Sequence, residues 1–67
     1  MANAVDARGL SCPQPVILTM RALEKSSSCV VTVDNETAVQ NITRFCESRG
    51  KKVSVKEDGE DFVLTIG

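Results

Sequence analysis

The residues with the clearest chemical potential form the run Arg8-Gly9-Leu10-Ser11-Cys12-Pro13-Gln14-Pro15. Proline suits the first position of a helix, because its φ is already near the helical value and its missing N–H would have no intrahelical partner. The run therefore predicts Cys12 as the N-cap of a helix that starts with Pro13, Gln14 and Pro15. Ser, Thr, Asp and Asn are the usual caps, because their oxygens accept backbone N–H groups. A cysteine caps poorly, so its presence here points to sulfur chemistry.

The helix end is expected to activate the Cys12 thiol moderately. Stabilisation of an anion at a helix N-terminus lowers a free-thiol pKa of ~8.5 by roughly half a unit to one and a half. Pro15 removes one backbone donor, so the N–H of Gln14 is the donor left for the sulfur. Arg8 is a further source of positive charge, and the two proline rings stiffen the approach. These features favour a thiolate that is presented to another protein.

The composition argues against most other catalytic chemistry. The chain has three cysteines and no histidine, so a Cys–His dyad is excluded. Without a Cys-x-x-Cys pair a zinc site is not expected, and we expect neither a metal nor a bound cofactor. Cys29 and Cys46 follow the apolar phases of a strand and a helix, which predicts that both are buried structural residues.

Length and composition predict a single small domain over residues 1–67. A 42% apolar content with only two aromatic side chains favours an aliphatic core near the lower size limit for an independent fold. The net charge of −1 argues against a dedicated nucleic-acid binder. No stretch approaches the ~20 apolar residues that span a bilayer, and the first residues do not resemble a signal peptide. We therefore expect a cytoplasmic protein without membrane association.

The periodic segments predict the order β-α-β-α-β-β. Gly50 is expected just beyond the second helix, and Asp58-Gly59 is expected as a hairpin turn. The expected elements are a short strand around Val5, a helix from Pro13 to about Lys25, a strand over 29–33, a helix capped within 34–37 and reaching about Arg49, and strands over 52–57 and 61–66.

Apolar alternation predicts a two-layer α/β sandwich, with two helices packed on one face of a mixed four-stranded sheet. In the first helix we expect Val16, Ile17, Met20 and Leu23 to form the buried face. The in-phase strand residues expected beneath the helices are Val31, Val33, Val53, Val55, Phe62, Leu64 and Ile66. Val30 and Val63 fall on the open face, either as scattered surface residues or as a docking or self-association patch.

Leu18 is the second residue of functional interest. At about 100° per residue it lies opposite Val16 on the expected solvent side of the first helix, beside Arg21 and one turn from Pro15. An exposed leucine needs no functional explanation by itself. Leu18 and Arg21 therefore form either an ordinary surface or a partner contact beside the thiol.

The segment Gly9-Leu10-Ser11-Cys12-Pro13-Gln14-Pro15-Val16 resembles the signature of the TusA/SirA/YedF family of small sulfur-carrier proteins. The similarity extends over nearly all of the chain. It implies the same β-α-β-α-β-β sandwich and a persulfide carried on Cys12. The segment from Asp34 to Ile42 looks closest to the YedF-like branch, which is associated with selenium metabolism and often joins such a domain to a DsrE-like one. Many members of the family have Asp at the position of Asn41. This difference affects which partner protein the chain is expected to bind, and it leaves the expected sulfur chemistry unchanged.

Residues and resemblance together predict a sulfur carrier. Cys12 would accept sulfane sulfur from a cysteine desulfurase or a rhodanese-like protein and pass it to an acceptor such as a DsrE-like or other thiol protein. The end product stays open between thiolated tRNA, a cofactor and selenium chemistry. A non-catalytic protein- or RNA-binding module is the alternative, and a redox enzyme pairing Cys12 with Cys29 or Cys46 is a third hypothesis. We expect a monomer or a weak dimer.

Overall fold

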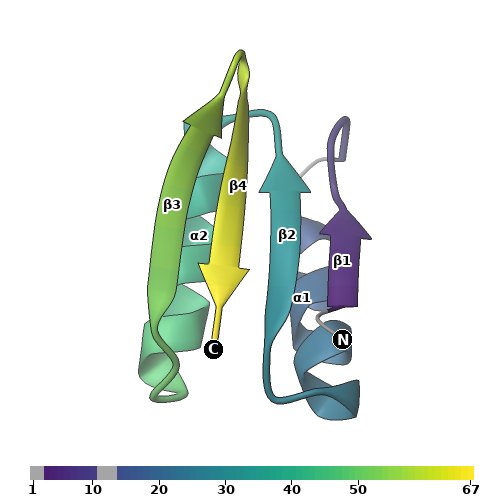
Figure 1. Cartoon of the computed structure of the whole chain (residues 1–67), viewed down its shortest axis with the longest axis vertical. Coiled ribbons are helices and arrows are strands. Elements are labelled where there is room, and N and C mark those ends of the chain that lie inside the picture. Colours follow the sequence, from purple (N-terminus) through teal and green to yellow (C-terminus); the bar gives the residue numbers. More distant parts are fainter. Residues whose placement is uncertain (1–2, 11–13) are drawn as a thin grey trace.

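The computed structural model describes residues 3–10 and 14–67, which form six elements in the order β-α-β-α-β-β (Figure 1). The elements are β1 (Asn3–Asp6), α1 (Gln14–Lys25), β2 (Cys29–Val33), α2 (Glu36–Ser48), β3 (Val53–Asp58) and β4 (Asp61–Ile66). The predicted order is confirmed, and the predicted bounds of β2 and β4 are the observed ones. Pro13, the expected first helical residue, lies outside the described residues.

One mixed sheet carries both helices on the same face, as the sequence predicts (Figure 1). The strand order is β1-β2-β4-β3, with β1 parallel to β2 and the other two pairs antiparallel. Parallel neighbours end at the same edge of a sheet, so β1 and β2 both finish where the β3–β4 hairpin turns. Both helices follow these strand ends. We call this edge the motif end and define it by residues 6–10, Gln14, residues 34–36 and residues 57–61.

The core is aliphatic and lies between the sheet and the helices. Its largest fully buried side chains include Ile42, Leu64, Ile66, Val31 and Val33. Cys29 and Cys46 are at most 1% exposed, which confirms them as buried residues. Burial disfavours the charged thiolate and is the main cause that raises the pKa of both thiols.

Both ends of α2 have the caps that the sequence predicts. Asn35 Oδ1 accepts a hydrogen bond of 2.8 Å from the backbone N–H of Ala38. At the other end Gly50 adopts a φ of 75°, its N–H donates to the carbonyl of Glu47, and Lys51 N–H donates to the carbonyl of Cys46. These two bonds form a Schellman motif, for which the left-handed glycine is required.

The buried face of α1 differs from the predicted one. Pro15, Thr19 and Ala22 are the buried residues of α1, one position earlier in the chain than Val16, Met20 and Leu23. Val16 and Leu23 are partly buried and pack against the core. One residue corresponds to a rotation of roughly 100°. The prediction was wrong about which residues are most deeply buried, because it followed the largest side chains, and it was right that Val16 and Leu23 contact the core. The Thr19 hydroxyl is satisfied in this position, since it donates to the Pro15 carbonyl at 2.8 Å.

Two details of the hairpin strands also differ from the prediction. Asp58 pairs with Asp61, so the turn residues are Gly59 and Glu60, one position later than expected. Gly59 has a φ of 64°, and among the described residues only glycines have a positive φ, so the φ of Glu60 is negative. A positive φ at the first turn residue alone is typical of a type II′ turn. Val55 is 46% exposed on the edge strand β3, although its phase is that of the core.

The orientation of α1 gives a first test. Ala22→Leu is expected to lower the free energy of unfolding by about 1–3 kcal/mol, because the larger side chain overpacks the contact with the sheet. Ile17→Ala is the matched change on the half-buried outer side, and its effect should stay below about 1 kcal/mol. Urea denaturation followed by circular dichroism measures both values. A larger loss of stability in Ile17→Ala than in Ala22→Leu would instead support the buried face that was predicted from the large apolar residues.

Candidate functional site

The described flanks of the Cys12 motif meet the starts of both helices at the motif end. Within the motif, Leu10 is half-buried on one side of Cys12, and the exposed Gln14 begins α1 on the other side. Ser11, Cys12 and Pro13 lie outside the described residues. The N-cap role of Cys12 and the first-turn role of Pro13 therefore stay predictions.

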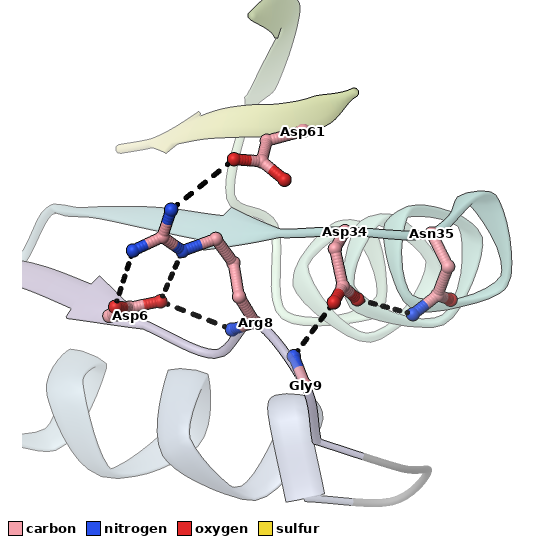
Figure 2. A network of polar contacts seen from close by, with 6 residues as sticks. All are labelled: Asp6, Arg8, Gly9, Asp34, Asn35 and Asp61. Carbon is pink, nitrogen blue, oxygen red and sulfur yellow. Dashed lines mark hydrogen bonds and ion pairs between the residues drawn. The ribbon is translucent and has the colours of Figure 1, made fainter. Parts of the chain in front are cut away.

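A hydrogen bond from Gly9 to Asp34 joins the first residue of the motif to the segment after β2 (Figure 2). Gly9 N–H donates to Asp34 Oδ2 at 2.8 Å, and Asn35 Nδ2 donates to Asp34 Oδ1 at 3.1 Å. The Gly9 bond is the main cause that lowers the pKa of the Asp34 carboxyl. Gly9 has a φ of 75°, a conformation that favours glycine, so its predicted supporting role has a backbone reason. Sequence reasoning missed this function of Asp34, which it treated only as part of the helix cap.

Arg8 directs its charge toward two carboxylates. Its Nε and Nη2 lie 2.9 and 3.0 Å from the oxygens of Asp6, and its Nη1 lies 3.4 Å from Asp61 Oδ2. The guanidinium thus reaches from β1 across to β4 (Figure 2). The side-chain bond from Arg8 is the main cause that lowers the pKa of Asp6 to about 2. Assistance of Arg8 to Cys12 stays a prediction, and the described contacts of Arg8 serve to join the loop to the sheet.

Pro15 and Val16 form one wall of a cavity beside the motif. The cavity has a volume of about 160 Å³ and lies between the start of α1 and the start of α2. Its lining residues are Leu10, Pro15, Val16, Asn35, Thr37, Ala38 and Asn41. The cavity could not be predicted from local sequence patterns, because its walls come from two helices that are distant in the sequence. Asn41, the position noted for its departure from the family, belongs to this lining.

Leu18 does not lie on a solvent-facing side as predicted. It is half-buried and packs against the core, because α1 is rotated relative to the expected orientation. Together with Val5 and the exposed Arg21 it lines a shallow depression beside β1. A partner contact at Leu18 and Arg21 stays a prediction.

Within residues 3–10 and 14–67, no group of three or more Cys, Asp or Glu side chains is placed to hold a metal ion. No helix in the same part of the chain is long and apolar enough to cross a membrane.

Among the three cysteines of the sequence, Cys29 and Cys46 are buried in the core. Neither cysteine in the described part of the chain is therefore accessible to the thiol of another protein.

The fold and the motif end define a class of small α/β domains that carry a Gly-Leu-x-Cys-Pro-x-Pro signature between a strand and a helix. The chain belongs to the TusA family, described as sulfurtransferase TusA, whose model matches residues 3–67. A protein of Methanocaldococcus jannaschii described as a proposed sulfur carrier is 37% identical over 59 residues, which cover 84% of this chain and 79% of the relative. The crystal structure of a SirA-like protein from Desulfitobacterium hafniense is similar, with a TM-score of 0.87 and 31% identity, over 94% of this chain and 92% of that one.

The Asp6–Arg8 pair predicts a shifted acid titration. The pKa of Asp6 is about 2 in the folded protein against an ordinary 3.8, so the pair adds stability above the ordinary value and loses it as the pH falls to about 2. Carbon-detected NMR titration of the Asp6 carboxyl should give this low midpoint. Arg8→Gln should return it toward 3.8. A wild-type midpoint already at the ordinary value would contradict the pairing.

The Asp34–Gly9 bond gives a second prediction at this site. Asp34→Ala removes the acceptor and should accelerate hydrogen exchange of the Gly9 amide, because local opening becomes easier. Asp34→Asn keeps an acceptor oxygen in the same place and should have a smaller effect. Amide exchange measured by NMR distinguishes these variants. Unchanged exchange of Gly9 in Asp34→Ala would show that the bond does not hold the loop.

Proposed function

We propose that this protein is a sulfur carrier that accepts sulfane sulfur as a persulfide on Cys12 and relays it to a thiol of an acceptor protein. Membership of the TusA family over residues 3–67, with the signature from Gly9 to Val16 intact, is the observation that carries the proposal. The relative from Methanocaldococcus jannaschii, described as a proposed sulfur carrier, supports the same class of function.

The proposed transfer balances without an external oxidant or reductant. The Cys12 thiolate attacks the outer sulfur of a donor persulfide, so an S–S bond forms on Cys12 while the donor S–S bond breaks. The donor sulfur leaves with the electron pair as a thiolate. In the second step an acceptor thiolate attacks the outer sulfur of the Cys12 persulfide, and Cys12 leaves as the thiolate.

The burial of the other two cysteines supports relay over intramolecular redox chemistry. Cys29 and Cys46 are almost completely enclosed, and burial raises the pKa of both thiols. A thiol that is enclosed and protonated is a poor resolving nucleophile. A persulfide on Cys12 would therefore react with the thiol of a partner protein rather than with Cys29 or Cys46. The family match does not favour the alternative of a non-catalytic binding module.

The proposed relay requires a donor and an acceptor. A cysteine desulfurase or a rhodanese-like protein would supply the sulfur, and a DsrE-like or other thiol protein would receive it. A place in selenium metabolism, as in the YedF-like branch, and a place in tRNA thiolation are both extensions of the same chemistry. Direct comparison of sulfur and selenium loading would separate the first extension from ordinary sulfur transfer.

Loading of Cys12 tests the proposal. Incubation with a cysteine desulfurase and cysteine should add one sulfur atom to the intact protein, and peptide mapping should place it on Cys12. Cys12→Ser should remain unloaded, whereas Cys46→Ala should load because that buried thiol has no part in the transfer. Failure of the wild type with several competent donors, or equal loading of Cys12→Ser, would refute the carrier function.

A further inference from the structure

Charge is distributed very unequally between the two ends of the molecule. All nine acidic side chains belong to the described residues, and seven of them lie at the motif end. Asp6 ends β1, Asp34 and Glu36 flank the cap of α2, and the other four lie between Glu57 and Asp61. Only two of the eight basic residues, Arg8 and Lys56, lie in the same half, and Arg8 is shared between two carboxylates. The motif end therefore has a strongly negative surface.

The cavity between α1 and α2 opens at this acidic end of the molecule, next to the segment that carries Asp34 and Glu36. Asp6, Asp58 and Asp61 line a separate depression at the same end, together with Thr32 and Val63. In the cavity, Leu10, Pro15, Val16 and Ala38 give a largely apolar lining, while Asn35 and Thr37 alternate in the sequence with Asp34 and Glu36 at the start of α2. The cavity's volume of about 160 Å³ is close to that of an engineered apolar cavity, ~150 Å³, that accepts one benzene molecule. A single apolar side chain fits such a space. Leu10 and Pro15 belong to the motif itself, so an occupant of the cavity is bound beside it.

We infer that the protein which exchanges sulfur with Cys12 presents a cationic surface and inserts one apolar side chain into the cavity between α1 and α2. This inference rests on the proposed function. Opposite charges on the two proteins steer their encounter, and the buried apolar side chain fixes the register of docking. A phosphate-rich partner such as RNA has the wrong charge for this surface. The basic residues of the chain gather at the opposite end, so the charge pattern also orients the approaching protein.

Acceptor peptides of defined charge test the partner chemistry. Cys12 is first loaded by a small persulfide whose organic group carries no charge, and transfer is then measured to three cysteine peptides. One peptide carries lysines and a leucine, the second carries glutamates and the leucine, and the third carries lysines with serine in place of leucine. Each rate is divided by the rate of the same peptide with the free small persulfide, which removes differences in thiol reactivity.

The lysine–leucine peptide should react about tenfold faster than the glutamate peptide at an ionic strength of ~0.01 M, and the ratio should approach one at ~1 M as the charges are screened. The serine peptide should react more slowly than the lysine–leucine peptide. Ala38→Leu, which fills the cavity, should remove the advantage of leucine over serine. Methyl NMR shifts of Leu10 and Val16 should respond to a cysteine-free lysine–leucine peptide and not to its serine counterpart.

Two charge variants of equal composition provide the control. Glu36→Gln with Glu60→Gln at the motif end should reduce the preference for lysine peptides, whereas Glu24→Gln with Glu47→Gln at the opposite end should preserve it. Equal rates for all peptides, or equal effects of the two double variants, would overturn the inference while leaving the carrier function intact. A Cys12 that cannot be loaded at all would instead overturn the proposed function.

Discussion

The parallel pairing of β1 with β2 is the constraint on which the rest of the structure depends. Parallel neighbours cannot be joined by a tight turn, so the chain must cross over the sheet before β2 begins, and α1 is that crossover. The Cys12 motif consequently falls between the end of β1 and the start of α1. The same pairing brings the end of β2 alongside, where Asp34 accepts the hydrogen bond from Gly9 across 25 residues of sequence. A local signature is thus held in place by a long-range contact.

Two electrostatic effects oppose each other at the motif end. The starts of α1 and α2 favour negative charge, whereas the surrounding carboxylates disfavour it, and Arg8 is already engaged by Asp6 and Asp61. Pro15 further reduces the donors available at the start of α1. This balance suits the proposed relay, because thiolate nucleophilicity falls as the thiol pKa falls, and the carrier must both accept and release sulfur. A strongly stabilised thiolate would attack a donor persulfide slowly, although it would leave readily when the sulfur is passed on.

The sequence predicts those parts of the fold that depend on alternation, capping and burial along a single segment. The bounds of β2 and β4, the caps of α2 and the burial of Cys29 and Cys46 all follow from such local signals. Features made by two distant segments were not predictable. The pair between Arg8 and Asp61 spans 53 residues, and the walls of the cavity come from both helices. Val55 has the alternation phase of the core residues but is exposed, because β3 lies at the edge of the sheet. The position of a strand within a sheet depends on the topology and cannot be predicted from the strand's own sequence.

The error in the orientation of α1 explains the surface of the helical layer. Pro15, Thr19 and Ala22 are the buried residues of α1, and the larger Val16, Met20 and Leu23 lie beside residues of α2. Large side chains between two helices line the space between them without filling it. One cavity therefore opens near the helix starts, beside Leu10, and a second depression opens between Leu23 and Phe45 near the helix ends. The orientation of α1 that a prediction from side-chain size misses is thus the one that places Pro15 and Val16 in the wall of an apolar cavity next to Cys12 in the sequence.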